Sequence, residues 1–305
     1  MYLVLLLALK EYTDIPFIYG ERNFMEKPNI KFSVLMSIYY KEKPEYLSLA
    51  LNSVFNQTLK ATEVVLVEDG KLTNELESVI SNYENKYKEL KVIKFEKNRG
   101  LGPALNDGIR ACKYNYIARV DTDDVCRNDR FEIQIRYLSE NPCIDIIGSN
   151  MTEYDAEMKN IVSKKVVPEN HEEIKKYLKK RNPMNHPTVI YKKDKVLEAN
   201  SYEDYPYFED YYLWAKMMKN GCKFYNIQDE LYNFRAGSSM IQRRGGKKYL
   251  QCILKFEKAL LNLKLINKFT YYNNIMKRWI VALLPNSFRE KIYHVFLRKK
   301  NGDEI

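Results

Sequence analysis

Short apolar runs alternate with amphipathic stretches between residues 30 and 150. The apolar runs are rich in Val, Ile and Leu, as strands are, and the stretches between them place apolar residues at helical spacing. Strands separated by helices indicate βαβ units and a mostly parallel sheet that binds ligands at the carboxyl ends of its strands. We therefore predict an α/β fold with strands at 31–38, 64–67, 90–95 and 116–120 and helices at 46–55, 74–87 and 102–112.

This alternation of apolar runs and amphipathic stretches ends after the apolar run at 144–148. Several prolines interrupt the next 90 residues, which favours a mixed segment of short elements and loops. The pattern then becomes helical over 249–265, 271–284 and 288–300. We predict an N-terminal extension (1–29), a main domain (30–240) whose halves meet near residue 150, and a helical C-terminal segment (241–305).

Composition adds a strong asymmetry of charge. Residues 243–305 hold 15 Lys and Arg against 4 Asp and Glu, and the whole chain has a net charge of +10, so the basic excess lies in this last part. Such a segment suits an anionic membrane surface or nucleic acid. The apolar run at 2–9 is too short to span a bilayer and lacks the flanks of a signal peptide, so we expect a strand or surface segment there. Five cysteines without Cys-x-x-Cys spacing favour reduced thiols in a cytoplasmic protein.

An acidic cluster follows the fourth predicted strand. It consists of Asp121, Asp123 and Asp124 within Asp-Thr-Asp-Asp. Carboxylates this close repel one another, and at a strand end they face the ligand crevice of an α/β sheet. A divalent ion such as Mn²⁺ or Mg²⁺ that carries a diphosphate would relieve the repulsion. The alternative is a helix cap followed by a solvated acidic turn.

The other predicted strands also end in polar or aromatic side chains. Ser37 and Tyr39 close the first strand, Asp69 closes the second, and Arg99 follows the third. Each of these alone is more often a simple turn residue, but four successive strand ends suited to a nucleotide favour one shared ligand. No Gly-x-Gly-x-x-Gly and no Gly-x-x-x-x-Gly-Lys-Ser/Thr motif is present, so a dinucleotide site of the classical kind and a P-loop are not supported.

Taken together, these motifs resemble the family 2 glycosyltransferases of the GT-A fold, with a Rossmann-like central sheet. The resemblance covers about residues 31–240 and rests on Ser-Ile-Tyr, Ser-Val-Phe-Asn-Gln-Thr (53–58), Val-Glu-Asp-Gly (67–70), Asn-Arg-Gly-Leu-Gly (98–102), Asn-Asp-Gly-Ile (106–109) and Asp-Thr-Asp-Asp. It implies a UDP-sugar donor bound through Mn²⁺ or Mg²⁺, with Tyr39 stacking near uracil and Asp69 contacting the base. It also implies that Asp123 lies by the ribose and metal, with Asp121 and Asp124 completing the metal site. Tyr40 departs from the family, which commonly has Asn there.

The same resemblance implies a catalytic role for the second half. Glu209 and Asp210 match the family's Glu-Asp segment, with Asp210 as the base that takes the acceptor's proton and Glu209 as its partner. One base without a second nucleophilic carboxylate then implies single displacement with inversion. An acidic pair at a helix N-terminus is the plain alternative. His186 is expected near the diphosphate or acceptor, and Arg243, with Arg235 and Arg244, in a loop that closes over the diphosphate.

The resulting hypothesis is a cytoplasmic, inverting hexosyltransferase at the inner face of the cell membrane. We expect galactose or glucose to pass from a UDP-sugar to a lipid-linked acceptor such as undecaprenyl-diphosphate-GlcNAc, in bacterial O-antigen or capsule synthesis. The basic C-terminal helices would contact anionic lipid. The main alternative is an inactive glycan- or nucleotide-sugar-binding module. A nucleic-acid-binding protein is not supported, because no binding motif accompanies the charge, and a nucleotidyltransferase would normally show a Gly-rich phosphate loop.

Overall fold

The computed structural model describes residues 28, 30–236 and 246–283. The apolar run at 2–9, Arg243, Arg244 and the predicted helix at 288–300 lie outside these residues. The first half folds as the pattern predicts, and each predicted strand and helix is confirmed within two residues of its ends. Its elements are β1 (Phe32–Ile38), α2 (Pro44–Phe55), β2 (Glu63–Glu68), α3 (Asn74–Lys86), β3 (Leu90–Lys94), α4 (Leu101–Ala111) and β4 (Tyr116–Arg119).

The second half contains longer strands than its interrupted sequence suggests. The longest are β6 and β9, which pair in parallel despite a separation of about 80 residues. The elements are β5 (Val125–Cys126), α5 (Arg130–Glu140), β6 (Ile146–Tyr154), β7 (Ile161–Lys165), α6 (His171–Leu178), the 3₁₀ turn η1 (His186–Thr188), β8 (Ile190–Lys192), α7 (Lys193–Glu198), α8 (Glu209–Lys219), β9 (Phe224–Arg235), α10 (Gly246–Asn262) and α11 (Lys268–Leu283).

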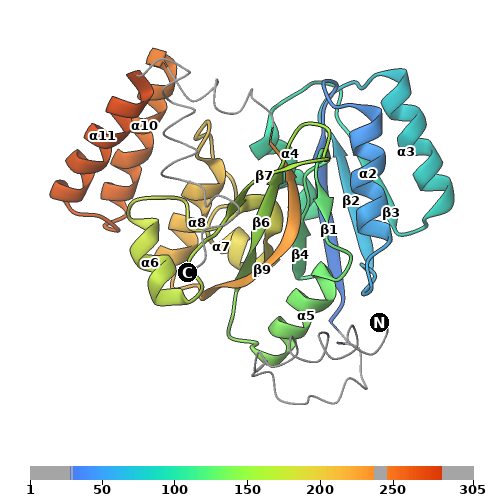
Figure 1. Cartoon of the computed structure of the whole chain (residues 1–305), viewed down its shortest axis with the longest axis horizontal. Helices are drawn as coiled ribbons and strands as arrows, with labels where there is room; N and C mark the ends of the chain where they lie inside the picture. The colour runs from blue at the N-terminus through green and yellow to red at the C-terminus, as the bar shows by residue number, and fades with distance from the viewer. Residues whose placement is uncertain (1–27, 29, 237–245, 284–305) are drawn as a thin grey trace, which may run out of the picture.

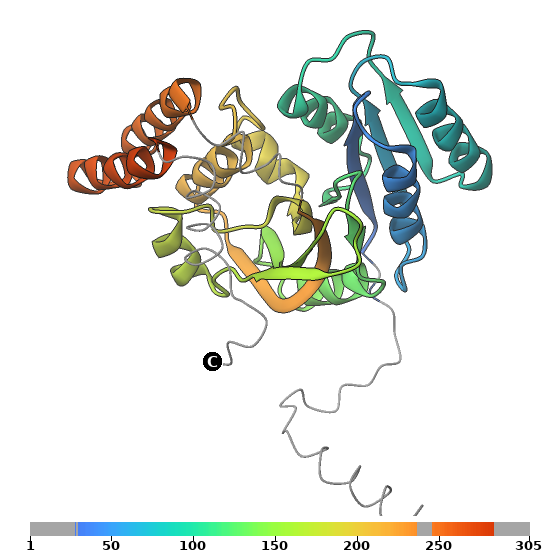
Figure 2. The same ribbon diagram turned by 45° about the horizontal axis from the view of Figure 1, so that its top comes forward.

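One sheet runs through both halves in the order β3-β2-β1-β4-β8-β6-β9-β5, and β7 extends it from β6 (Figure 1). Strands β3, β2, β1 and β4 are parallel neighbours, as βαβ units require. Strand β8 enters antiparallel between β4 and β6. Beyond it the sheet curls, with β9 curving across β6 (Figure 2). The carboxyl ends of β1, β2 and β4 therefore meet at one edge, where the predicted donor residues follow.

Two hydrophobic clusters cover the two faces of the sheet. Alternation along β1 sends Leu35 into the cluster under α4 and α8, and Val34 and Met36 into the cluster under α2, α3 and α5. Helix α4 lies close to the sheet because it carries Gly108 there. A Cβ on Gly108 would lie only 2.3 Å from a methyl carbon of Leu35, so a larger residue would push the helix away.

The C-terminal helices α10 and α11 pack against each other beside α8 and α6, on the opposite side of the molecule from α2 and α3 (Figure 1). Glu257 of α10 is fully buried and pairs with the Arg278 guanidinium of α11 at 2.9 Å. Arg278 also lies over the rings of Phe208 and Tyr211, at the start of α8. Among the described helices, none is long and apolar enough to cross a bilayer.

Candidate active site

The acidic cluster occupies the turn between β4 and β5, at the sheet edge where the sequence predicted it. Arg119, the last residue of β4, is buried and binds the Asp121 carboxylate through its guanidinium. The Thr122 hydroxyl lies 3.4 Å from the Ser37 carbonyl oxygen and 3.2 Å from a carboxylate oxygen of Glu42. The turn is therefore held against the end of β1, and the two predicted strand ends meet.

Glu42 is a fourth carboxylate at this site, and the sequence analysis missed it. It lies between Tyr40 and the start of α2, where no periodic pattern or motif marks it. Burial and, to a smaller extent, the negative charge of Asp121 raise its pKa. The only available signal was its position, a few residues after the end of β1, in the turn that faces the ligand edge.

Crowding and burial set the electrostatics of the cluster. Burial, then the charges of Asp121 and Glu42, raise the pKa of Asp123 to about 7. Burial, then the charges of its two neighbours, also raises the pKa of Asp124 well above its ordinary value. These carboxylates therefore favour a cation nearby. Their all-oxygen donor set suits Mg²⁺ or Mn²⁺.

The number of possible protein ligands is small. Within residues 30–236 and 246–283, no three acidic, His or Cys side chains converge on a point that would hold a metal ion. Asp124 is fully buried, and one of its oxygens accepts the backbone N–H of Arg235 at 2.7 Å. The cluster thus fits an ion held by one or two carboxylates whose other ligands come from a diphosphate, which is the usual arrangement for Mg²⁺.

Arg235 lies at the end of β9 and not in a free loop, which corrects the expectation that it waits to cover a diphosphate. It is only 7% exposed. Its Nε donates to the Asp123 carbonyl oxygen at 2.8 Å, and its guanidinium lies 3.7 Å from the ring centroid of Tyr46. Arg235 therefore holds the backbone of the acidic turn from the β9 side. Arg243 and Arg244, which were expected in the same loop, lie outside the described residues.

Asp69 closes β2 as predicted, and its carboxylate binds the loop that follows β3. One oxygen accepts the N–H of Arg99 and the other accepts the N–H of Gly100, both at 2.8 Å. This tie fixes the turn that begins α4. The Arg99 side chain pairs with Asp107 at 2.5 Å and stacks on the Phe95 ring. Contacts of Asp69 with a base and of Arg99 with phosphates remain predictions.

Tyr39 is the exposed aromatic side chain at the end of β1 that the predicted stacking requires. It is 41% exposed, and its ring meets that of Tyr40 edge-on at 5.9 Å between centroids. Ser37, two residues earlier, is half-buried. An exposed ring at a strand end is available to a planar base, so the placement is compatible with the predicted role.

A cavity of about 180 Å³ brings together the residues predicted for the second half. It is lined by Leu101, His186, Tyr202, Glu209 and Asp210. Leu101 begins α4 directly after the loop that Asp69 holds, and Glu209 begins α8. The cavity therefore lies where the two halves of the domain meet. Leu101 and Tyr202 had no sequence signal, because nothing local marks a cavity wall formed by distant segments.

His186 is held by Tyr202, with 2.8 Å between its Nε2 and the tyrosine hydroxyl. Burial, followed by the positive charges of Arg119 and Lys165, lowers the pKa of His186 well below its ordinary value. The imidazole is therefore neutral at physiological pH. Arg119 also binds Asp121, so the same arginine binds the acidic cluster and acts by its charge on a residue of the cavity.

Glu209 and Asp210 open α8, and the preceding backbone is strained. Tyr207 has a φ of +72°, a conformation that side chains other than glycine rarely adopt. Asp210 accepts hydrogen bonds from Asn182 Nδ2 at 2.6 Å and from the Tyr211 N–H at 2.7 Å, so its carboxylate is fixed in orientation. Burial, then the charge of Asp210, raises the pKa of Glu209 to about 7.

Comparison with known proteins agrees with this arrangement. The family described as glycosyl transferase family 2 matches residues 33–199. Over 271 residues the chain is 39% identical to an Escherichia coli UDP-Gal:α-D-GlcNAc-diphosphoundecaprenol β-1,3-galactosyltransferase, covering 88% of this chain and 97% of the relative. It is 41% identical over 266 residues to the amylovoran biosynthesis glycosyltransferase AmsE of Erwinia amylovora, covering 86% of this chain and 97% of the relative.

Solved structures share the fold at low sequence identity. The complex of Staphylococcus aureus TarS with UDP-GlcNAc superposes with a TM-score of 0.59 at 20% identity, over 86% of this chain and 70% of the other. The mannosyltransferase PcManGT of Pyrobaculum calidifontis, solved with GDP-Man and Mn²⁺, gives 0.58 at 13% identity, over 94% and 79%. The predicted GT-A fold is thereby confirmed. Because the family match spans more than half of the sequence, the chain belongs to glycosyltransferase family 2.

Proposed function

We propose that this protein transfers a hexose from a UDP-sugar to a lipid-linked saccharide during synthesis of a bacterial surface polysaccharide. The similarity to a galactosyltransferase that acts on GlcNAc-diphosphoundecaprenol favours galactose as the sugar and that acceptor as the class. The observation that carries the proposal is the link that Arg119 makes between two sets of carboxylates. Arg119 binds Asp121 of the acidic turn, and its charge acts on His186, which lines the cavity together with Glu209 and Asp210.

The acidic turn is proposed as the donor side. Asp123 and Asp121 would hold a divalent ion, and Asp124, whose carboxylate is buried against Arg235, would support the turn. When bound, such an ion neutralises charge on the diphosphate and so favours departure of UDP. Tyr39 would stack on the uracil, and Ser37, Asp69 and Arg99 would surround the base, ribose and phosphates. Mn²⁺ in a solved structure of the same fold supports divalent metal use.

Asp210 is proposed as the base on the acceptor side. A new bond forms between the acceptor oxygen and the anomeric carbon while the bond from that carbon to the β-phosphate oxygen breaks. The hydroxyl proton passes to Asp210, and UDP leaves with the electron pair, so a single displacement inverts the anomeric centre. Two fixed hydrogen bonds orient the carboxylate. Glu209 and the neutral His186 would contact the acceptor or the diphosphate.

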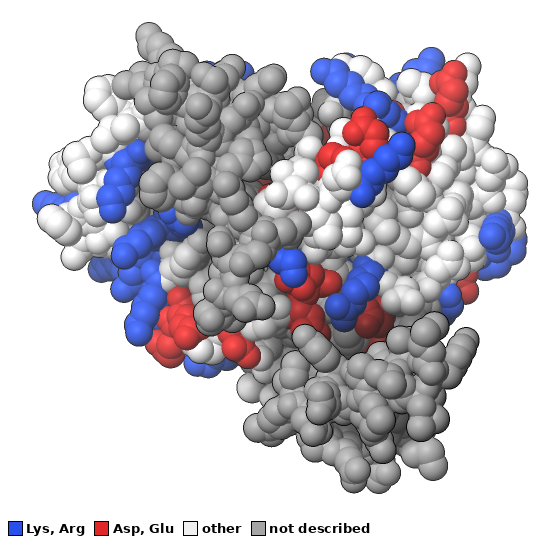
Figure 3. Space-filling view, viewed as in Figure 1, with Lys and Arg blue, Asp and Glu red and all other residues white. Residues whose placement is uncertain are grey.

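A membrane surface is proposed as the partner of α11. This helix exposes an apolar stripe at positions 269, 272, 276, 279 and 280, whose side chains are 52% to 80% exposed. These positions follow helical spacing and form one face. Lys and Arg side chains lie along the side of the molecule formed by α6, α10 and α11 (Figure 3). An apolar face flanked by cations suits the interface of an anionic membrane, from which a lipid-linked acceptor would be presented.

Release of UDP tests the proposed activity. Purified protein would be incubated with Mn²⁺, a panel of UDP-sugars and an undecaprenyl-diphosphate-GlcNAc acceptor. We expect acceptor-dependent UDP release with UDP-galactose or UDP-glucose, and a disaccharide product with inverted anomeric configuration. No UDP release with any donor would contradict the proposal.

A further inference from the structure

The segment Ser53–Thr58 carries part of the family resemblance, but the proposed reaction gives it no role. It spans the last turn of α2 and the residues that follow. Gln57 is 1% exposed although its side chain is an amide. A buried amide needs partners for both its N–H groups and its oxygen, so its contacts show what the segment holds.

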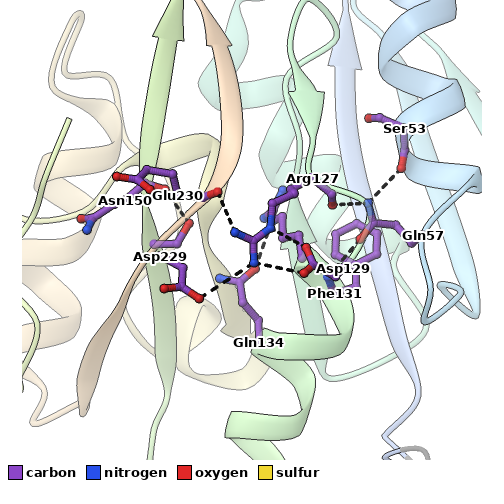
Figure 4. Close-up of polar contacts among 11 residues, drawn as sticks. Ser53, Gln57, Arg127, Asp129, Phe131, Gln134, Asn150, Asp229 and Glu230 are labelled. Carbon is purple, nitrogen blue, oxygen red and sulfur yellow. Dashed lines mark hydrogen bonds and ion pairs between the residues drawn. The ribbon is translucent and has the colours of Figure 1, made fainter. Parts of the chain in front are cut away.

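Gln57 Nε2 donates to the Ser53 carbonyl oxygen of its own segment at 3.0 Å, and the other contacts lie on the stretch of chain directly after the acidic turn. Gln57 Nε2 donates to the Arg127 carbonyl oxygen at 2.7 Å, and Gln57 Oε1 accepts the Phe131 N–H at 3.0 Å. Ser53 Oγ accepts the Cys126 N–H at 3.1 Å. The backbone N–H of Thr58 donates to the Asn128 carbonyl oxygen at 2.8 Å. Figure 4 shows Gln57 between Ser53 on one side and Arg127 and Phe131 on the other.

Strand β9 holds the same stretch from the opposite side. Cys126 pairs with Tyr232, and the Arg127 N–H donates to the Leu231 carbonyl oxygen at 3.0 Å. The Arg127 guanidinium reaches the Glu230 carbonyl oxygen at 3.3 Å and an Asp229 carboxylate oxygen at 3.9 Å (Figure 4). The chain that leaves Asp124 is therefore held between α2 and β9.

We propose that Ser53 and Gln57 are positioning residues for the metal-diphosphate site. The acidic residues end at Asp124, and Cys126 is only two positions further along, so a shift at 126–131 moves the carboxylates as well. On the β9 side the turn is tied through Arg235 and strand pairing. On the α2 side the tie at 126–131 depends on the side chains of Ser53 and Gln57 and the backbone of Thr58. This inference rests on the proposed donor function of the acidic turn.

Replacing the Gln57 amide removes hydrogen bonds to the stretch after the acidic turn. Leucine at this position keeps most of the volume but leaves the Arg127 carbonyl and the Phe131 N–H without their partner in a buried place. The Gln57→Leu protein should therefore bind donor and metal more weakly than wild type.

A calorimetric titration of the full chain with UDP in the presence of Mn²⁺ tests the inference without relying on turnover. We expect the dissociation constant to rise about tenfold in Gln57→Leu and about threefold in the milder Ser53→Ala. Turnover with saturating Mn²⁺ and donor should fall less than affinity does. If wild type binds UDP and Mn²⁺ and both variants bind equally well, the positioning role is wrong. If wild type itself fails to bind, the proposed donor function fails instead.

Asn226→Leu is the matched control. Asn226 is also fully buried, and its Nδ2 donates to the carbonyl oxygens of Pro168 and Pro183, in the other half of the domain. It should lose thermal stability as Gln57→Leu does and keep wild-type affinity for UDP with Mn²⁺. An equal loss of affinity in this control would show that general destabilisation explains the effect, and would overturn the proposal.

Discussion

The site contains two sets of carboxylates, the acidic turn after β4 and the Glu209-Asp210 pair, and their surroundings differ. The acidic turn after β4 is crowded: burial, followed by neighbouring negative charges, raises the pKa of Asp123 and of Asp124, while Arg119 and Arg235 hold the turn in place. The Glu209-Asp210 pair opens a helix, where backbone N–H groups favour negative charge, and Asp210 accepts two hydrogen bonds. The first group favours a nearby cation, whereas the second includes Asp210, the carboxylate that we propose as the base.

Asp210→Asn should have the largest effect on turnover. The amide keeps the shape of the side chain but cannot take the acceptor's proton, so the rate should fall at least about 10³-fold. The measurement is the initial rate of UDP release at saturating donor and acceptor. Glu209→Gln is the matched control and should lose less. Turnover of Asp210→Asn at the wild-type rate would remove the base assignment.

Asp123→Asn should act on the metal instead. One ligand loses its charge, so the Mn²⁺ concentration that gives half-maximal activity should rise about 10²-fold. A Mn²⁺ titration of activity measures this shift. Asp145→Asn, at a carboxylate paired with Lys192 just before β6, provides the control and should leave the metal dependence close to wild type. An unchanged metal dependence in Asp123→Asn would contradict the donor-side assignment.

Polar substitution of the α11 stripe should weaken membrane binding while both carboxylate groups keep their function. We expect Phe269→Ser, Tyr272→Ser and Trp279→Ser together to lower binding to vesicles containing anionic lipid about tenfold or more, because exposed apolar area is lost. Sedimentation with vesicles measures this. Ile161→Ser, at an exposed apolar side chain of β7, is the control. Undiminished binding by the triple variant would reject the proposed surface.

The smallest expected effect is that of Glu209→Gln on the free energy of unfolding, and it should depend on pH. The pKa of Glu209 is about 7 in the folded protein, so the folded state holds this proton up to that pH, whereas the unfolded chain releases it near the ordinary pKa of 4.5. Because the folded state binds more protons in this window, wild-type stability falls as pH rises from 4.5 to 7. The variant lacks this loss, so it should gain about 1 to 2 kcal/mol relative to wild type between pH 4.5 and 8, after allowance for solvent screening.

Denaturant unfolding at several pH values measures the gain. Glu173 is an exposed carboxylate on α6, so Glu173→Gln serves as a control. A Glu209→Gln difference that does not vary with pH would show that Glu209 titrates normally.

The sequence predicted the first half well because its information is local. Four apolar runs and three amphipathic stretches fix β1 to β4 and α2 to α4, and the strand order then brings the acidic turn beside the end of β1. The second half depends on pairing between distant segments. Strands β6 and β9 are joined across about 80 residues, and β8 enters antiparallel beside β4. No periodicity within either segment specifies such partners.

The candidate site residues show the same difference between local sequence information and tertiary contacts. Asp121 and Asp123 were singled out because they follow a predicted strand, whereas Glu209 and Asp210 were singled out only through the family resemblance. Glu42 and Tyr202 join the site only through the tertiary fold. Two arginines were harder to interpret from sequence. Arg235 and Arg119 hold the acidic turn from inside the protein, although charged residues are usually expected at the surface.

The most direct test compares Asp123→Asn and Asp210→Asn in one experiment, a calorimetric titration with UDP in the presence of Mn²⁺. If the acidic turn holds the donor and Asp210 acts on the acceptor, Asp210→Asn should bind with an affinity within about twofold of wild type, while Asp123→Asn should bind about 10²-fold more weakly. Equal weakening in both variants, or normal affinity in Asp123→Asn, would contradict this division between the two carboxylate groups.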